Sequence, residues 1–413
     1  MNPNWQTVRL GDVAEVVGGG TLSTTNNAYW DGEISWITPK DLTGYTNIYI
    51  GKGERSISQK GLENSSARLL PEGTVLLTTR APIGYVAIAS TNLCTNQGFK
   101  SFIVDEQKLH NLFLFYWLKG NTRYLQAIGT GTTFMEIPGK RAREIEIVLP
   151  PLPTQRAIAT TLSCLDEKIE LNNRINANLE AQAQAIFKSW FVDFDPFKGG
   201  KFVDSELGGI PKGWRVGTLG DVCDVKGGKR LPRGENLSTV PNKHPYIRVR
   251  DLNNTVFVQM TSSVEYIPDD IQVGISQYTV SSNDMVLSIV GTIGLVCIVH
   301  PSLDAANLTE NCVKLTNYNG VISTWLFLFL SSDRGKEQIR NVTVGAVQSK
   351  LPIKNIQSIT FILPPVEVMS EFDRIVSGIF KLIAENCTQS RTLAAIRDTL
   401  LPKLMSGEVE VEE

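Results

Sequence analysis

The sequence lacks several features that would place it in familiar classes of protein. Among its 413 residues no apolar run reaches the roughly 20 residues that a membrane-spanning helix needs, and the N-terminal stretch has no apolar signal segment. The six cysteines form no Cys-x-x-Cys pair, so we expect free thiols in a reducing cytoplasm. The three histidines are far apart in the chain and predict no metal site.

Motifs of nucleotide-dependent enzymes are also missing. The Gly-Lys pairs at residues 51–52 and 139–140 are not followed by Ser or Thr in the frame of a phosphate loop. Residues 2–5, NPNW, are not the Asn-Pro-Pro-aromatic tetrapeptide of amino-methyltransferases. The glycine cluster at 18–20 is more typical of a turn than of a nucleotide site. We therefore expect that this chain is not an enzyme and binds no cofactor itself.

The net charge of −2 argues at first against a nucleic-acid partner, but the charge is unevenly distributed. Residues 1–150 hold 14 Lys and Arg against 13 Asp and Glu, and residues 205–363 hold 15 against 13. The excess of acidic residues lies in the two segments 152–204 and 364–413. The distribution allows a basic face on each globular segment without establishing one.

What the sequence does contain is an internal repeat. The string LGDV at residues 10–13 returns at 219–222, and Ile-Gly at 83–84 returns at 293–294. The strand-like IEIVLPP at 145–151 returns as ITFILPP at 359–365. One unit of about 205 residues is thus used twice, in the way that repeated sequences indicate repeated structure.

A long helix is predicted to follow each globular part, because apolar residues recur at alternating steps of four and three. Each position of the first seam has a counterpart 214 residues later, with Asn172 and Asn386 at the same place near the middle. The predicted seam residues are Ile158, Leu165, Ile169, Asn172, Leu179, Ile379, Ile383, Asn386 and Leu393. Two amphipathic helices packed on separate local cores remain the alternative.

The predicted fold is α+β, with two repeated mixed α/β domains separated by two long helices in an antiparallel, pseudo-two-fold coiled coil. The domains are residues 1–150 and 214–363, the helices 151–195 and 364–407, the linker 196–213 and the acidic tail 408–413. Strands are expected at 74–79 and 85–89, and buried helices at 109–119 and 321–331. The aromatic cluster Phe113, Phe115, Tyr116 and Trp117 is interpreted as core.

Four stretches then carry a family resemblance. They are PPLPTQRAIA at 150–159, FKSWFVDFDP at 187–196, SELGGIPKGW at 205–214 and RDTLLPKLMSGE at 397–408. Over essentially its whole length the chain resembles the specificity subunit of type I restriction–modification enzymes. The resemblance implies two target-recognition domains that each bind one half of a split double-stranded DNA sequence. It also implies helices that set the gap and dock two methyltransferase subunits, with restriction subunits joining them. S-adenosylmethionine, ATP and Mg²⁺ would belong to those partners.

Candidate DNA contacts are Arg, Lys, Gln and Thr residues in loops of the two domains, since such side chains bind phosphates and base edges. They are Thr24, Lys40, Arg80, Lys100, Thr133, Lys140, Arg141, Lys229, Arg230, Arg233, Arg248, Arg250, Gln348 and Lys350. The basic stretch 226–233 occupies the repeat position of the 18–24 loop.

Two other functions remain open, a coiled-coil scaffold whose globular parts bind protein and a stand-alone DNA-modifying enzyme. For the assembly, Phe187, Trp190, Phe191 and residues 400–404 are predicted to lie near docking surfaces, with local core as an equal alternative.

Overall fold

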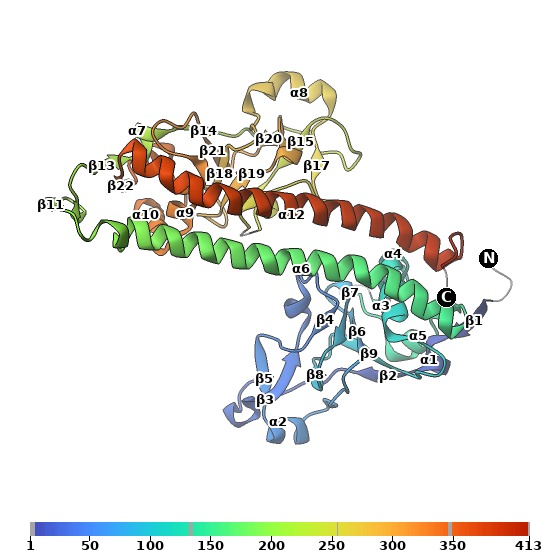
Figure 1. The fold of residues 1–413 in the computed structure, drawn as a ribbon. Coiled ribbons are helices and arrows are strands. Elements are labelled where there is room, and N and C mark those ends of the chain that lie inside the picture. The colour runs from blue at the N-terminus through green and yellow to red at the C-terminus, as the bar shows by residue number, and fades with distance from the viewer. Residues whose placement is uncertain (1–4, 132–134, 254, 346–348, 412–413) are drawn as a thin grey trace. The chain divides into compact units, whose positions relative to one another are not determined.

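The computed structural model describes residues 5–131, 135–253, 255–345 and 349–411. It divides into two compact units. The first unit comprises Met1–Leu171 with Thr392–Glu413, and the second comprises Asn172–Arg391. The two long helices α6 (Leu152–Phe191) and α12 (Val366–Ser406) both run through the boundary between these units (Figure 1).

The strands of the first unit are β1 (Gln6–Arg9), β2 (Ala14–Gly18), β3 (Trp30–Ile37), β4 (Tyr49–Ile50), β5 (Arg55–Ile57), β6 (Val75–Thr79), β7 (Ile83–Ala89), β8 (Leu93–Thr95), β9 (Phe99–Val104) and β10 (Glu146–Leu149). Its short helices are α1 (Leu10–Val13), α2 (Gln59–Glu63), α3 (Asn111–Gly120), α4 (Thr122–Ala127) and α5 (Gly139–Arg143), with 3₁₀ turns η1 (Asn27–Tyr29) and η2 (Pro39–Leu42).

The strands of the second unit are β11 (Phe202–Ser205), β12 (Gly208–Pro211), β13 (Arg215–Thr218), β14 (Asp224–Gly227), β15 (Pro245–Ile247), β16 (Phe257–Val258), β17 (Glu265–Tyr266), β18 (Met285–Ser288), β19 (Val296–Val299), β20 (Asn307–Leu308), β21 (Cys312–Thr316) and β22 (Thr360–Leu363). Its short helices are α7 (Leu219–Val222), α8 (Asp269–Ile275), α9 (Ser323–Ser331), α10 (Asp333–Val342) and α11 (Ile353–Gln357), with 3₁₀ turns η3 (Asp195–Phe197), η4 (Val249–Asp251), η5 (Ser276–Tyr278) and η6 (Pro301–Leu303).

The repeat predicted from the sequence is confirmed by the sheet topology. The five-stranded sheet β2-β9-β6-β7-β4 of the first unit has the same order as β14-β21-β18-β19-β16 of the second. The three-stranded sheets β5-β3-β8 and β17-β15-β20 correspond in the same way, as do the two-stranded pairs β1-β10 and β13-β22. Both units are therefore α+β domains in which mostly antiparallel sheets pack against helices.

The core of the first unit lies where α3 packs on strands β6 and β7. The side chains of Phe113, Phe115 and Tyr116 are 0–1% exposed and that of Trp117 is 9% exposed, so the prediction that this cluster is core is confirmed. In the second unit Trp325, Phe327 and other apolar residues of α9 are buried in the same way. Both helices are almost wholly apolar because they are enclosed on all sides, as expected for a central core helix.

Helices α6 and α12 pair antiparallel within each unit. In the first unit, Arg397 of α12 contacts Asp166 of α6, while Leu404, later in α12, shares a core with Ile158, earlier in α6. In the second unit, Phe372 of α12 packs against Trp190 of α6 with ring centroids 5.9 Å apart. The predicted seam residues are buried or half-buried along both helices, as knobs of a coiled coil are.

Four polar residues form a layer in the coil of the second unit. Asn172 Nδ2 donates to Ser390 Oγ at 3.2 Å, and Asn386 Nδ2 donates to Asn176 Oδ1 at 2.9 Å. Asn386 is the repeat equivalent of Asn172, and Ser390 is the repeat equivalent of Asn176, in each case 214 residues later. The two hydrogen-bonded pairs therefore occupy equivalent positions of the two repeats. Such a layer fixes the register of a coil, since any slip would leave buried amides unpaired.

The linker contains structure that the sequence did not indicate. Helix α6 ends at Phe191, and the chain then forms η3 and the hairpin β11-β12. Strand β12 begins with two glycines, and Gly208 has a φ of +95° that favours glycine. The composition, rich in Gly, Pro and charge, suggested a linker because no apolar alternation marks these short strands.

Candidate nucleic-acid interface

Three of the predicted arginines line one surface hollow in the second unit. The hollow has a volume of about 580 Å³ and is lined by Arg230, Arg248 and Arg250 together with Glu265 and Glu310. Arg230 comes from the loop after β14, and the other two arginines flank and enter the 3₁₀ turn η4 after β15. Residues far apart in the chain thus meet here because β15 and β20 are parallel neighbours.

Carboxylates hold the three guanidinium groups in place. Arg230 Nε contacts Glu310 Oε1 at 2.6 Å, and this hydrogen bond raises the pKa of Arg230. Arg248 contacts Glu265, whose carboxylate also lies 3.2 Å from Arg250. Each arginine keeps further N–H donors, and a planar guanidinium suits two-point contacts with phosphate or guanine. The hollow therefore presents positioned donors to an acceptor-rich ligand.

The first unit builds the same loop on the same backbone hydrogen bonds. The amides of Gly19 and Gly20 donate to the carbonyls of Phe99 and Thr95. At the equivalent positions Gly228 donates to the carbonyl of Cys312 and Lys229 to that of Leu308. The prediction that the 226–233 stretch occupies the repeat position of the 18–24 loop is therefore confirmed.

The side chains on this shared frame differ between the units. Strand pairing places Arg55 opposite Trp36 in the first unit and Glu265 opposite Tyr246 in the second. The Arg55 guanidinium stacks 3.3 Å from the Trp30 ring centroid. Lys40, the equivalent of Arg250, pairs with Glu54 at 2.6 Å while its side chain is 76% exposed. A carboxylate in one unit is thus replaced by a stacked cation in the other.

Two other predicted cations, Arg80 and Lys100, lie beside Glu136 in the first unit. The backbones of Arg80 and Glu136 form an antiparallel bridge, and Lys100 Nζ lies 3.4 Å from the Glu136 carboxylate. The short helix α5, which carries Lys140 and Arg141, begins three residues after Glu136. At the equivalent bridge the second unit has Val290 and Lys350.

The other predicted contacts are not brought into either group. Thr24 and Arg233 are exposed on the two equivalent loops. Lys229 Nζ lies 5.7 Å from the centroid of the Tyr278 ring. Thr133 and Gln348 lie outside the described residues. Over the ranges that the structure describes, no group of His, Cys, Asp and Glu could hold a metal ion.

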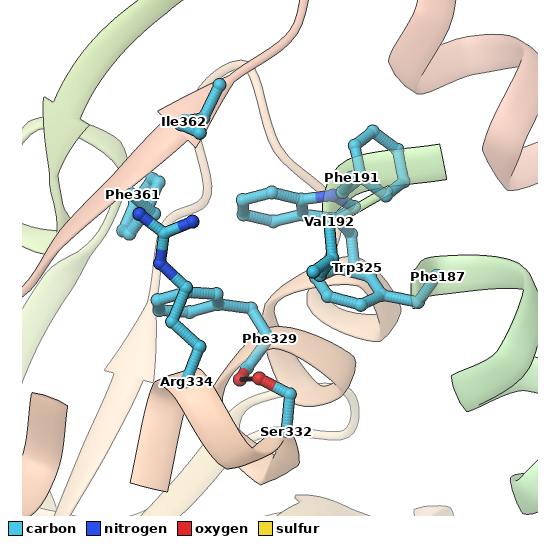
Figure 2. Close-up of a pocket in the computed structure, with 9 residues that line it drawn as sticks. All are labelled: Phe187, Phe191, Val192, Trp325, Phe329, Ser332, Arg334, Phe361 and Ile362. Carbon is cyan, nitrogen blue, oxygen red and sulfur yellow. Dashed lines mark hydrogen bonds between the residues drawn. The ribbon is translucent and has the colours of Figure 1, made fainter. Parts of the chain in front are cut away.

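Two of the predicted docking aromatics are instead core residues of the second unit. Phe187 and Phe191 are 2% and 5% exposed and pack on Trp325. Figure 2 shows them around a small cavity of about 20 Å³, into which Trp325 and Phe329 also point. Of the two alternatives for these rings, local core is therefore confirmed and a docking surface is not, because α6 turns this face toward α9 and strand β22.

Comparison with known proteins decides the family. The model of the type I restriction modification DNA specificity domain matches the chain twice, over residues 2–181 and 211–396. The chain belongs to this specificity family. The two matches coincide with the two copies of the repeat, so each copy is one specificity domain with its following helix.

Relatives of the whole chain carry the same family name. The MjaIX specificity subunit of Methanocaldococcus jannaschii is 37% identical, covering 99% of this chain and 94% of the relative. The HindI specificity subunit of Haemophilus influenzae is 24% identical, covering 98% and 100%. The crystal structure of a type I S subunit from M. genitalium superposes with a TM-score of 0.57 at 19% identity, covering 98% and 96%. That likeness supports the fold of this specificity-family chain.

Sequence reasoning missed the acidic half of the arginine hollow. Glu265 and Glu310 were not singled out, although they position all three arginines. Nor was Arg55, which the structure places on Trp30. Comparing the two copies residue by residue was the available signal, since Arg55 and Glu265 are equivalent and opposite in charge.

Proposed function

We propose that this chain is the DNA-recognition subunit of a type I restriction–modification complex and catalyses nothing itself. Residues 1–150 bind one half of a bipartite double-stranded target and residues 214–363 bind the other. The observation that carries the proposal is the duplicated loop frame with unlike side chains, Thr38, Lys40 and Arg55 against Arg248, Arg250 and Glu265. Unlike donors and acceptors at equivalent positions would select different bases.

The helices would serve assembly and spacing. In the second unit Ile375 and Leu382 of α12 are 39% and 50% exposed. Gly378 lies between them on the same helical face, with open space beside it. An exposed apolar stripe with a recess fits a helix of a partner, and the family resemblance makes that partner a methyltransferase subunit. S-adenosylmethionine, ATP and Mg²⁺ would be bound by the methyltransferase and restriction subunits.

The cytoplasm is the compartment that fits this function. All six cysteines are free thiols, as expected in a reducing environment. No helix within the described ranges is apolar over a length that would span a bilayer.

The test of recognition is a domain exchange. Residues 1–150 are replaced by those of a relative with a different target, and the methylated motif is determined by methylome sequencing. We expect one half of the motif to change and the other half to stay. The reciprocal exchange of residues 214–363 is the matched control and should change only the other half. A change in both halves, or in neither, contradicts the proposal.

The spacing role is tested by lengthening the coil. Because Asn172 pairs with Ser390 and Asn176 with Asn386, Arg174 faces Thr388. Four residues are therefore inserted into each helix at directly opposite points, after Arg174 in α6 and after Cys387 in α12. Insertions after Asn176 and Ser390 would not lie opposite each other and would shift the two helices out of register. The added length is about 6 Å, and a four-residue insertion is tolerated as a stutter.

We expect the gap between the half-sites to grow by about one or two base pairs, given steps of about 3.4 Å. Both half-site sequences should be retained. Insertion in α6 alone is the control, and it should disrupt the polar layer rather than lengthen the gap. The original gap in a stable doubly inserted variant would show that the helices do not set the spacing.

A further inference from the structure

The arginine hollow of the second unit is balanced in charge. Its wall holds three arginines, and it also holds three glutamates, Glu235, Glu265 and Glu310. A DNA phosphate carries a full negative charge and is bound by sites in which cations are in excess. The edge of a base pair has no net charge and offers hydrogen-bond donors and acceptors instead. The balance therefore favours a base edge over a phosphate as the ligand of this hollow.

Arg230 presents the free end of its guanidinium group in this hollow. Its Nε atom lies 2.6 Å from Glu310 Oε1, and its side chain is exposed. Among the residues that the structure describes, none forms a hydrogen bond or an ion pair with either of its Nη groups. Both Nη groups can therefore donate to one ligand. Two parallel N–H donors match O6 and N7 of guanine, the base that arginine most often contacts in the major groove.

Glu310 holds this arginine in place and is itself held. Its Oε2 atom accepts from Thr309 Oγ1 at 3.1 Å, while Oε1 faces Arg230. Burial raises the pKa of Glu310, but the hydrogen bond from Arg230 and further hydrogen bonds lower it, with a net decrease. The carboxylate therefore stays ionised beside the guanidinium group. An arginine that is already tethered loses less side-chain freedom when it binds, so Glu310 acts as a positioning residue.

The other two arginines of the hollow are placed differently. Arg248 is half-buried and donates from Nη2 to the carbonyl of Ser263 at 3.3 Å. It also shares the carboxylate of Glu265 with Arg250. Arg248 is thus used within the protein and supports the wall. Arg230 is the arginine of this hollow that has a carboxylate to itself and both Nη groups free.

The first unit has an uncharged pair at the equivalent place. On the shared loop frame, Thr21 stands where the second unit has Arg230. Gln97, two residues after the end of β8, stands where the second unit has Glu310 after β20. An ion pair that one copy has and the other lacks is typical of a position that selects a base, since backbone contacts carry no sequence information.

We infer that Arg230 donates through both Nη groups to O6 and N7 of a guanine in the half-site that the second unit binds, with Glu310 as its positioning residue. The guanine is contacted from the major groove, where both acceptors lie. The first unit, with Thr21 and Gln97, makes no such contact at the equivalent position of its own half-site. The inference rests on the proposed function and names the base that this part of the second unit selects.

The test removes one acceptor atom from the DNA. The full chain is assembled with the methyltransferase subunits of its system and titrated with duplexes that contain the methylated motif. In each duplex one guanine of the second unit's half-site, as the domain exchange assigns it, is replaced by 7-deazaguanine, which lacks N7. We expect one position at which the wild type loses about tenfold in affinity. At that position Arg230→Ala should show no further loss, because the contact is already gone.

Lys243→Ala is the matched control. Lys243 is exposed in the same unit and does not line the hollow, and its replacement also removes one positive charge. This variant should keep the full loss at the identified guanine. Arg230→Thr combined with Glu310→Gln copies the first unit and should abolish that loss, while the selectivity for the other half-site stays unchanged.

Glu310→Gln separates positioning from simple structural support. Glutamine keeps an acceptor beside Arg230 but gives the hollow a net positive charge. We expect the loss caused by 7-deazaguanine to become several-fold smaller. Binding to scrambled DNA should become tighter and depend more steeply on salt, as binding to phosphates does. A merely structural role would weaken all DNA binding without these changes.

Three results would overturn the inference. One is a second half-site without guanine in either strand. Another is that Arg230→Ala leaves every 7-deazaguanine effect as it is in the wild type. The third is an equal loss of affinity for every sequence in Arg230→Ala, with a shallower salt dependence, which marks a phosphate contact. In all three the motif stays bipartite, so the proposed function stands.

Absence of any sequence-specific binding by the wild-type complex would contradict the proposed function and the inference together. Unchanged thermal unfolding of each variant establishes that the second unit is folded. If Arg230→Ala alters the unfolding, Arg230→Lys takes its place with the same expected result, since lysine keeps the charge but cannot make the two-point contact.

Discussion

The two units hold the same pair of helices by opposite means. In the first unit the contact is charged, because Asp166 of α6 is buried and accepts from Tyr116 Oη at 2.9 Å. Arg397 of α12 contacts the other oxygen of that carboxylate, and Lys119 lies 3.6 Å away. Burial, with the negative charge of Asp166 next, raises the pKa of Tyr116 above its usual range, so the phenol stays a donor.

In the second unit the equivalent positions are uncharged. Phe380, Ala183, Leu328 and Ser331 replace Asp166, Arg397, Tyr116 and Lys119. The Phe380 ring packs edge to face on Phe327 with centroids 6.0 Å apart. The same backbone therefore accommodates either a charged cluster or an apolar cluster, provided that every member of the cluster is present.

The difference lies in what happens when one member is removed. Replacing a buried ion pair with well-packed apolar side chains is often neutral or stabilising, whereas removing one partner costs about 3–5 kcal/mol. The first unit therefore depends on each member of its charged cluster. The stability of the second unit depends on filled volume. Removing one apolar group there destabilises the fold in proportion to the cavity that it leaves.

The largest expected effect comes from breaking the charged cluster. Arg397→Ala leaves Asp166 buried beside only Lys119 and Tyr116, and we expect it to lower the free energy of unfolding by about 3–5 kcal/mol. The measurement is denaturant unfolding followed by tryptophan fluorescence, with both units monitored by hydrogen exchange.

Transplanting the apolar solution sharpens the comparison. The variant with Tyr116→Leu, Lys119→Ser, Asp166→Phe and Arg397→Ala copies the second unit, and most of the loss should be recovered. Ala183→Arg places an unpaired charge in the second unit and is the matched control, expected to destabilise by a similar amount. Equal stability of Arg397→Ala and the wild type would show that the cluster is not a structural contact.

The next effect concerns DNA and compares two equivalent cations. Arg250→Ala and Lys40→Ala each remove one donor, and loss of a base contact is expected to cost about 1–3 kcal/mol in binding. Relaxed specificity should appear only in the half-site of the altered unit. Competition titrations with each half-site scrambled in turn measure this. An equal loss of affinity for every DNA sequence would mean that the altered residue contacts a phosphate. Its replacement would then make the binding affinity depend less steeply on salt concentration.

Much of the fold was predictable because its helices and strands leave periodic patterns in the sequence. The apolar seam, the repeated strands and the proline pairs that precede both helices each carry a local signal, and the family resemblance agreed with them. The strands β6 and β7 and the buried helix α3 fall within a few residues of the predicted ranges. The clustering of basic residues on the 226–233 loop was also visible from the repeat.

The partners of those residues were not predictable. Arg397 stands at a position of the helix seam where an apolar residue is expected. The carboxylate that it contacts belongs to Asp166, 231 residues away in the chain. Glu265 and Glu310 reach the arginine hollow only through strand pairing. Such contacts follow from the tertiary fold, so no local pattern marks them. The burial of Phe187 and Phe191 likewise depends on which face of α6 meets α9.

The smallest expected effect compares how each unit fastens a long helix to its loops. In the first unit Gln155 of α6 accepts from the amide of His110 and donates to the carbonyls of Lys108 and Pro150. An amide side chain does not titrate. In the second unit His300 Nε2 lies 3.2 Å from the carbonyl of Ala384 in α12, and Nδ1 accepts from the amide of Ser302 at 3.1 Å. A protonated ring keeps the first contact but can no longer accept at Nδ1, so the way His300 is held depends on pH.

Burial lowers the pKa of His300, the carbonyl of Ala384 raises it, and the charge of Arg391 lowers it, with a net decrease. The fold therefore favours the neutral ring. The stabilisation that the neutral His300 ring gives the folded state is fully present above the pKa of His300 in the unfolded chain, about 6.5. It is lost as the pH falls below that value. The rest of the chain titrates equally in the wild type and in His300→Gln, whose side chain keeps a donor but has no charge to gain.

We therefore expect the stability difference between the wild type and His300→Gln to be larger at pH 7.5 than at pH 5.5. Unfolding by urea across that range measures the difference, and hydrogen exchange of the α12 amides near Ala384 locates it in the second unit. The amides of α6 near Gln155 serve as the internal comparison and should show no such change. A difference that is constant with pH would mean that His300 acts only through its shape and its hydrogen bond.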